Sequence, residues 1–283
     1  GLLPYPIVDT SQIRCYSASA EVEFPRTGAE FFGQDAHYTG NAPSYEDNGD
    51  GTVTDLVTGL MWLSDPGDKK TFKQAGADAA KCRTGGHDDW RLPTIKELYS
   101  LILFSGIDVS SFDSVGGAVP FMDTDYFEFE YGDTREGERV IDSQMSTSTL
   151  YVGTTMGGLE TMFGVNFADG RIKGYPKDGK TYFVYYVRGD TDYGTNIFTN
   201  NGDGTISDES TGLMWMQMDR GSFGAGDDSD GALTWEQALS WAENLEYAGY
   251  SDWCLPNAKE LHSIVDYTRS PATNDSAAID PIF

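Results

Sequence analysis

One block of sequence occurs twice in this chain, and its length constrains the architecture. The first copy reads DNGDGTVTD at residues 47–55, TGLMW at 58–62 and DWRLPTIKEL at 89–98. The second copy reads NNGDGTISD, TGLMW and DWCLPNAKEL between residues 200 and 261. Each copy is longer than a solenoid repeat and long enough to bury a core of its own. The repeat therefore predicts two related modules in tandem.

Residues at equal places in the two copies are counterparts. Trp62 corresponds to Trp215, and Trp90 corresponds to Trp253 at an offset that is ten residues larger. The second copy therefore carries an insertion between these blocks, which includes the acidic run 227–231. A solvated loop and an ion site both explain that run.

The chain divides into a leader at 1–44 without a repeat partner, a first module at 45–190 and a second module at 191–283. The first module ends with segments rich in β-branched and aromatic residues, which predict closing strands. These segments are Met162–Phe167, Arg171–Tyr175 and Thr181–Arg188.

The second module has no counterpart of these closing strands in the sequence. Its apolar helix faces nevertheless need cover, because a large exposed patch is a liability. Two explanations stay open. The first, which we favour because the sequence stops within the module, is that the sequence is a piece of a longer protein. The second is that a neighbouring subunit supplies strands in trans, which predicts self-assembly.

Each copy contains two capping boxes, in which a Thr or Asn is followed three residues later by Gln or Glu. The boxes at Thr71 and Thr234 predict helices over 71–83 and 234–245. The boxes at Thr94 and Asn257 predict a second helix in each module, after a Leu-Pro pair. The expected buried faces are Ile95, Leu98, Leu101 and Ile102, and Leu261, Ile264 and Val265. These patterns predict an α+β fold, with two short helices packed on small antiparallel sheets in each module.

The net charge of −26 arises from 45 acidic and 19 basic side chains. Such a surface repels phosphate and sulfate groups, which argues against nucleic acid or heparin as partners. It suits a divalent cation or a cationic partner, and a merely solvated surface explains it equally well. We expect no membrane span, because no apolar stretch is long enough. The first residues, GLLPYP, have the form of a processed, mature chain.

The motifs follow one order: the NGDG turn, the TGLMW strand, a capped helix, DWRLP with its KEL helix, a Ser/Thr-rich strand, the VNFADGRI hairpin and a YVR strand. This order resembles the Lcl C-terminal-domain family, a bacterial group, over 45–188 completely and over 198–283 for its first half. The resemblance implies a C-type-lectin-like fold and an extracellular or surface-exposed binding module, with an adhesin as the named member. Members often carry one Cys in the first helix and one in the last strand. Cys82 fits the first position, but Tyr186 occupies the second.

The acidic turns are candidate calcium sites. An EF-hand register with Asp50 in fifth place puts Val57 in twelfth place, where a bidentate carboxylate is required, so an EF-hand is excluded. A looser site remains open, and a plain hairpin turn is the favoured alternative. The candidate calcium ligands are Asp47, Asn48, Asp50 and Asp55 in the first copy and Asn201, Asp203 and Asp208 in the second.

The repeated tryptophans, Trp62, Trp90, Trp215 and Trp253, have two interpretations. They can stack on sugars, or they can pack in the module cores. Core packing is favoured, because all four lie in apolar blocks.

Catalysis finds little support in the sequence, and we expect a non-enzymatic protein. No nucleophile elbow, phosphate loop or HExxH motif occurs. The RLPT turn is similar to a segment of formylglycine-generating enzymes, which makes such an oxidase a remote alternative. Such an oxidase would need paired cysteines late in the domain, and Cys15, Cys82 and Cys254 do not supply them.

The favoured function is adhesin-like or lectin-like recognition of a glycan or protein on a surface, through long loops that a sheet braces. The Gly/Asp/Tyr-rich region 105–160 is the expected binding face. Its candidate contacts are Asp123, Asp125, Tyr126, Tyr131 and Asp133. The competing function is that of a structural subunit of an extracellular filament or surface layer.

Overall fold

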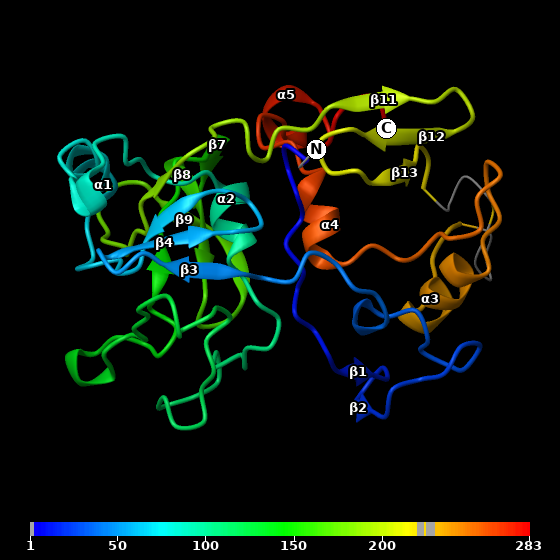
Figure 1. The fold of residues 1–283 in the computed structure, drawn as a ribbon, viewed down its shortest axis with the longest axis horizontal. Helices are drawn as coiled ribbons and strands as arrows, with labels where there is room; N and C mark the ends of the chain where they lie inside the picture. The colour runs from blue at the N-terminus through cyan, green and yellow to red at the C-terminus, as the bar shows by residue number, and fades with distance from the viewer. Residues whose placement is uncertain (1–2, 220–223, 225–229) are drawn as a thin grey trace.

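The two copies of the repeated block fold into two halves, which lie at the left and right of Figure 1. The computed structural model describes residues 3–219, 224 and 230–283. Most of the acidic run 227–231 therefore lies outside the described residues. Few helices and several small antiparallel sheets make up the structure, so the predicted α+β class is confirmed.

Each copy begins with a three-stranded antiparallel unit around the NGDG turn. The strands are β3 (Tyr45–Asp47), β4 (Thr52–Asp55) and β5 (Met61–Leu63) in the first module and β11 (Phe198–Asn200), β12 (Thr205–Asp208) and β13 (Met214–Met216) in the second. The registers agree, because Val53 pairs with Trp62 and its counterpart Ile206 pairs with Trp215. The repeated sequence thus produces a repeated structure.

All four predicted helices form, and each begins at its capping box. They are α1 (Phe72–Ala79), α2 (Ile95–Ser100), α3 (Trp235–Glu243) and α4 (Ala258–Ser263). The N-cap side chains of Thr71, Thr94, Thr234 and Asn257 each accept a hydrogen bond from the backbone three residues on. α1 and α3 end a few residues before the predicted positions 83 and 245.

A second sheet completes the first module. It consists of β6 (Gln144–Met145), β7 (Leu150–Thr155), β8 (Leu159–Asn166) and β9 (Arg171–Pro176), and β8 pairs with each of the other three. Two predicted closing strands are thereby confirmed as β8 and β9. The third, 181–188, forms a regular ladder only at β10 (Val187–Arg188), which joins the first sheet in the order β10-β5-β4-β3. Short 3-10 turns occur at η2 (Thr84–Gly86) and η3 (Thr134–Glu136).

The main core lies in the first module, where the first sheet and α2 meet the closing strands. Trp62 is fully buried and Trp90 is 4% exposed, as core packing predicts. The expected α2 face is buried as well: Ile95, Leu98, Leu101 and Ile102.

The second module buries its apolar residues less completely. Trp215 and Trp253 are only half-buried. Leu261 is 52% exposed, although its counterpart Leu98 is fully buried, so the prediction that Leu261 faces the core is wrong. Leu98 packs in a cluster that contains closing-strand residues such as Val165, and no such strand covers Leu261 among the described residues.

The leader packs against the second module. It contains β1 (Cys15–Tyr16), β2 (Glu21–Val22) and η1 (Asp35–His37), and it runs past α4 toward α3 (Figure 1). Tyr5 N–H donates to the carbonyl of Ser210 at 2.9 Å. Phe31 lies against Trp235, with 5.7 Å between the ring centroids. The leader therefore supplies part of the cover that the second module needs.

The opposite end of the chain docks on the first module. The short helix α5 (Pro271–Asn274) lies beside β7, where the hydroxyls of Tyr151 and Ser270 are 2.7 Å apart. The cysteines Cys15, Cys82 and Cys254 are free thiols. No helix in the described part of the chain is long and apolar enough to cross a membrane.

Candidate binding cleft

The NGDG segments form Asx-type turns that use their own acidic and amide side chains. The Asp47 carboxylate accepts from Gly49 N–H at 2.8 Å, and Asp50 accepts from the backbone and hydroxyl of Thr52 at 3.1 and 2.6 Å. The Asn48 amide donates to the Thr52 hydroxyl at 2.9 Å. The turn itself thus accounts for these side chains.

The second copy repeats this arrangement. Asp203 accepts from the backbone and hydroxyl of Thr205 at 3.0 and 2.7 Å, and the Asn201 amide donates to the hydroxyls of Thr205 and Ser207. Identical bonding at two places shows that the motif encodes a turn geometry.

The remaining candidate calcium ligands, Asp55 and Asp208, lie at the far ends of β4 and β12. Asp55 is buried and accepts from Val57 and Thr58 N–H, so it caps the turn before TGLMW. A strand rises about 3.4 Å per residue, which separates Asp55 from Asp50 by more than about 10 Å. Among residues 3–219, 224 and 230–283, no group of three or more His, Cys, Asp or Glu side chains is placed to hold a metal ion.

The five candidate ligand contacts of the 105–160 region do not form one site. Asp123 accepts from Asp125 N–H at 3.0 Å within a turn, and Asp133 pairs with Arg135 at the start of η3. Tyr126 packs against Tyr45 in the main core. Tyr131 belongs to a small separate cluster around Val109, Val140 and Ala168. No hydrogen bond, ion pair or ring contact joins the Asp123–Tyr126 turn to the Tyr131–Asp133 loop in the described part of the chain.

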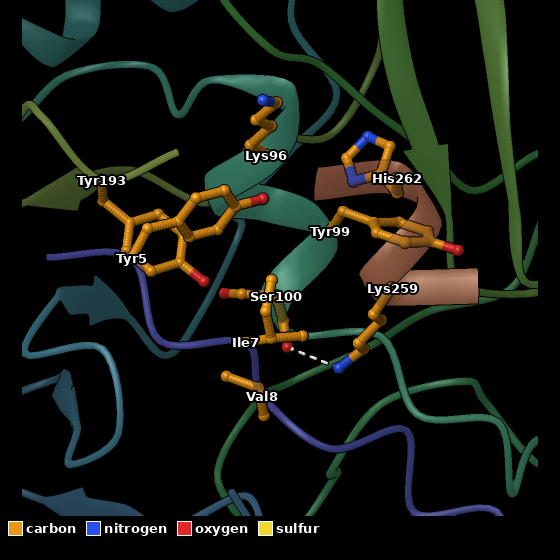
Figure 2. Close-up of a pocket in the computed structure, with 9 residues that line it drawn as sticks. All are labelled: Tyr5, Ile7, Val8, Lys96, Tyr99, Ser100, Tyr193, Lys259 and His262. Atoms are coloured by element: carbon orange, nitrogen blue, oxygen red, sulfur yellow. Dashed lines mark hydrogen bonds between the residues drawn. The ribbon is translucent and has the colours of Figure 1, made fainter. Parts of the chain in front are cut away.

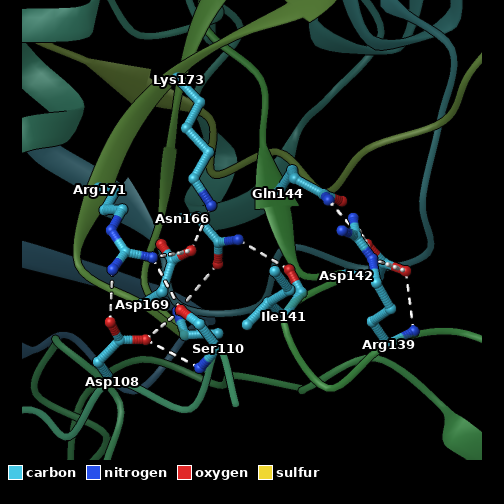
Figure 3. Close-up of polar contacts among 11 residues, drawn as sticks. Asp108, Ser110, Arg139, Ile141, Asp142, Gln144, Asn166, Asp169, Arg171 and Lys173 are labelled. Atoms are coloured by element: carbon cyan, nitrogen blue, oxygen red, sulfur yellow. Dashed lines mark hydrogen bonds and ion pairs between the residues drawn. The ribbon is translucent and has the colours of Figure 1, made fainter.

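An ion network centred on the buried Asp169 ties the 105–112 loop to the β8–β9 hairpin (Figure 3). Arg171 donates to Asp108 at 2.6 Å, to Ser110 at 2.7 Å and to Asp169 at 3.3 Å. Lys173 forms a second ion pair with the buried Asp169. These charges are paired with one another, so the network braces the hairpin.

The two modules meet through the counterpart helices α2 and α4. Lys96 Nζ donates to the carbonyl of Ser263 at 2.8 Å. Its counterpart Lys259 Nζ donates to the carbonyl of Ser100 at 3.0 Å, the bond that Figure 2 marks. The rings of Tyr99 and its counterpart His262 lie 4.4 Å apart between them. The interface is therefore approximately two-fold symmetric.

Burial strongly affects the titration of this interface. It lowers the pKa of Lys96 to about 8 and the pKa of Lys259 to about 7. It also lowers the pKa of His262 to about 3. Both ammonium groups are held by backbone carbonyls, so the lysines join the modules. Sequence reasoning missed this site, although the KEL motif in both copies was its signal.

A cleft opens between the leader and the second module, beside the start of α4. Its volume is about 210 Å³, and it is open to solvent. Its walls include the apolar side chains of Phe104, Trp235, Leu239 and Leu255 and the polar side chains of Thr10, Gln12, Gln34, Asp35 and Asn257. Trp235 is 41% exposed, so much of its indole is accessible.

The first module shows why this cleft is open. Phe72, the counterpart of Trp235, packs against a cluster that contains Met162 and Tyr182 from the closing half. In the second module, Phe31 of the leader lies against the larger indole of Trp235. The leader therefore covers this position less completely than the closing strands cover Phe72.

Two backbone groups at the start of α4 belong to cleft residues. They are the carbonyl of Pro256 and the N–H of Ala258, and neither has a hydrogen bond among the described residues. The side chain of their neighbour Asn257 already has hydrogen-bond partners. Its amide nitrogen donates to Asp35 at 3.0 Å, and its side-chain oxygen accepts from Glu260 N–H. The cleft thus has one open acceptor and one open donor beside an exposed indole.

Hydroxyl groups fill the same two positions in the first module. The Pro93 carbonyl accepts from the hydroxyl of Ser148 at 3.1 Å, and Ile95 N–H donates to the hydroxyl of Thr149 at 2.9 Å. The Ser148 N–H also donates to Pro93, at 2.8 Å. The backbone around this turn therefore binds hydroxyls where it is covered.

The fold defines an α+β protein of two related modules with a solvent-open cleft on the second. The family model of the Lcl C-terminal domain matches residues 51–188 and 204–281, and the chain belongs to this bacterial domain family. The second match is the shorter, in agreement with the predicted tandem copies. No curated protein and no solved structure matches the chain.

Proposed function

We propose that the chain is a non-enzymatic binding protein of the bacterial cell surface or extracellular space, with C-type-lectin-like modules, and that its cleft binds a saccharide. The single observation that carries this proposal is the pair of open backbone groups at Pro256 and Ala258 beside the exposed indole of Trp235. Saccharides present hydroxyl groups next to apolar C–H faces, so they match both features.

The contacts expected for such a ligand follow from the first module. A sugar hydroxyl takes the place of the Ser148 hydroxyl at Pro256, and a second takes the place of the Thr149 hydroxyl at Ala258. The pyranose face then stacks on Trp235, since aromatic rings favour contact with apolar surfaces that carry polar edges. Asp35, which accepts from the Asn257 amide at 3.0 Å, adds a charged acceptor beside the same turn.

The charge of the chain narrows the ligand class. At a net charge of −26, the protein repels sulfated and phosphorylated polymers. We therefore expect neutral saccharides to bind better than anionic ones, and the preference to weaken as salt screens the charges.

The test is a glycan array followed by titration of the best neutral saccharide. Trp235→Ala should weaken binding at least tenfold, whereas Phe112→Ala, which alters an exposed aromatic ring outside the cleft, should not change it. Ala258→Pro removes only the open N–H, because proline is well tolerated at the first position of a helix. Ala258→Ser keeps the N–H and serves as its control. Unchanged binding in both Trp235→Ala and Ala258→Pro would exclude this cleft as the site.

A second function, that of a filament or surface-layer subunit, is favoured by a different observation. The outer edge of β13 has no strand beside it among the described residues. Open sheet edges can add a strand from another chain.

A further inference from the structure

The third strand of the repeated hairpin is covered in the first module. β10 pairs with the outer edge of β5, with Val187 opposite Trp62. Leu63 N–H donates to the carbonyl of Tyr186 at 3.0 Å. On its other side, Val187 exchanges two backbone hydrogen bonds of 3.0 Å with Arg91. One extended segment thus fills a slot between β5 and the chain around Arg91.

The same slot is bounded by open backbone groups in the second module. Met216 is the counterpart of Leu63, and Cys254 is the counterpart of Arg91. In the described part of the chain, no hydrogen bond reaches the Met216 N–H or either backbone group of Cys254. Figure 1 places β13 on the side of its sheet nearest the extended segment that leads into α4.

The burial of counterpart side chains also differs between the two modules. In the first module Val184 and Tyr186 complete a buried cluster with Ala75, Ala79 and Trp90. Their second-module counterparts form no such cluster among the described residues, and of them only Ala242 is fully buried. The difference is clear at two positions: Ala238 and Trp253 are half-buried, whereas their counterparts Ala75 and Trp90 are buried.

Charge adds a further element of specificity. Arg188, at the end of β10, forms an ion pair with Asp89 at 2.7 Å. Asp252, the counterpart of Asp89, is exposed and has no ion pair in the described part of the chain. A cationic side chain at the corresponding place of an incoming strand would find this carboxylate available.

We propose that the slot between β13 and Cys254 binds an extended segment of a partner polypeptide, with the side-chain pattern Val-x-Tyr-x-Arg found at 184–188. The segment runs antiparallel to β13. Its backbone accepts from Met216 N–H and exchanges hydrogen bonds with Cys254, while its Val and Tyr side chains cover Trp253 and α3. Its Arg pairs with Asp252. This inference goes beyond saccharide binding, because the groups that hold the segment, on Met216, Asp252 and Cys254, do not line the cleft.

The experiment titrates the whole 283-residue chain with a labelled synthetic peptide of the sequence Lys180–Asp190 and follows fluorescence anisotropy. Saturable binding is expected, together with slower amide exchange at Met216 and Cys254. A peptide N-methylated at the position of Val187 should bind at least tenfold more weakly, since it has lost the donor to Cys254. A scrambled peptide of the same composition should not bind.

Two variants of the chain locate the site. Met216→Pro removes the outward N–H at an edge strand, where proline is tolerated, and should weaken the peptide at least tenfold. Met216→Leu restores the first-module residue and should bind as the unaltered chain does. Asp252→Asn should weaken binding several-fold at low salt and much less at high salt. Melting temperatures confirm that each variant is folded.

Three results would overturn the inference. The first is an absence of saturable peptide binding, and the second is binding that Met216→Pro leaves unchanged. The third is protection of the Met216 amide that grows with the concentration of the chain alone, because the occupant would then be a second copy. None of these results affects the saccharide titration, so the two proposals fail independently.

Discussion

Lys96 and Lys259 occupy equal places in the two modules, and each donates to a backbone carbonyl of the other module's helix. The acceptors, Ser263 and Ser100, are themselves counterparts. A repeated Lys-Glu-Leu motif thus builds the joint between the repeats. Because both ammonium groups are largely buried, the free energy of forming this interface depends on whether the two lysines are protonated.

The first prediction concerns pH above neutrality. The pKa of Lys259 is lowered to about 7 and that of Lys96 to about 8, whereas unfolded lysine titrates near about 10.4. Between these values the unfolded chain binds more protons, so the free energy of unfolding should increase from about pH 7 to about pH 9.5. Lys259→Met should flatten this rise, and Lys81→Met, on the exposed surface, should not. Urea melts at a series of pH values measure it, and an equal rise in all three proteins would contradict the prediction.

The second prediction concerns acid. His262 lies against Tyr99 and bonds to the hydroxyl of Tyr267 at 2.8 Å, and burial lowers its pKa to about 3. Unfolded histidine protonates near about 6.5, so the unfolded chain binds the extra proton first as pH falls. Stability should decrease below about pH 6.5, by at most about 1.4 kcal/mol per pH unit from this residue. His262→Phe should reduce the slope, whereas His87→Phe, outside the interface, should leave it unchanged.

The third prediction compares Trp90 with its counterpart Trp253. Trp90→Ala should cost about 3–5 kcal/mol, because it empties a closed core position. Trp253→Ala should cost less than half as much, since Trp253 is half-buried and lacks the cover that Val184 and Tyr186 give to Trp90. Both indoles donate to equivalent carbonyls, Trp90 at 3.1 Å and Trp253 at 3.3 Å, so hydrogen bonding is matched. Equal losses of unfolding free energy would show that the second slot is closed in solution.

Local sequence patterns predicted most of the repeated elements because their causes are local. The capping boxes at Thr71 and Thr234 supply hydrogen bonds to the helix N-terminus from within four residues. The side chains of the NGDG turns form their hydrogen bonds within the turn. Leu261 could not be placed in this way. Its spacing is the same as that of Leu98, and only the presence or absence of strands distant in the sequence decides which of them is buried.

The candidate site was beyond sequence reasoning for a related reason. The cleft joins Gln12 and Asp35 of the leader to Trp235 and Asn257 of the second module. Nothing in the leader sequence indicates that it packs there, since it has no repeat partner. The region 105–160 was predicted as the binding face from composition, but its tyrosines Tyr126 and Tyr131 instead pack in clusters.

The fourth prediction concerns calcium. The carboxylates of Asp50 and Asp203 already accept two hydrogen bonds each from the following threonine. We therefore expect millimolar calcium to leave the melting temperature unchanged. Asp50→Ala should cost about 1 kcal/mol through loss of the turn bonds. A rise in melting temperature with calcium that Asp50→Ala abolishes would establish the looser site considered for these turns.

The last prediction introduces into the second module an ion pair that the first module contains. In the first module Arg91 forms a bidentate ion pair with Glu97, with N–O distances of 2.8 and 2.6 Å, and the Glu97 side chain is fully buried. The counterpart pair is Cys254 and Glu260, and Glu260 has no ion pair among the described residues; burial raises the pKa of its carboxyl.

Cys254→Arg should therefore stabilise the chain by about 1 kcal/mol at neutral pH, as hydrogen bonds to a charged group do when the geometry is preorganised. The Leu-Pro turn and capping box that hold Arg91 over Glu97 are present at the same spacing around Cys254 and Glu260. Cys254→Met, which adds length without charge, is the control. The gain should disappear as acid protonates Glu260, because the pair then loses its anion. Chemical denaturation at neutral and acid pH measures both effects, and an equal gain from Met would attribute the stabilisation to apolar packing instead.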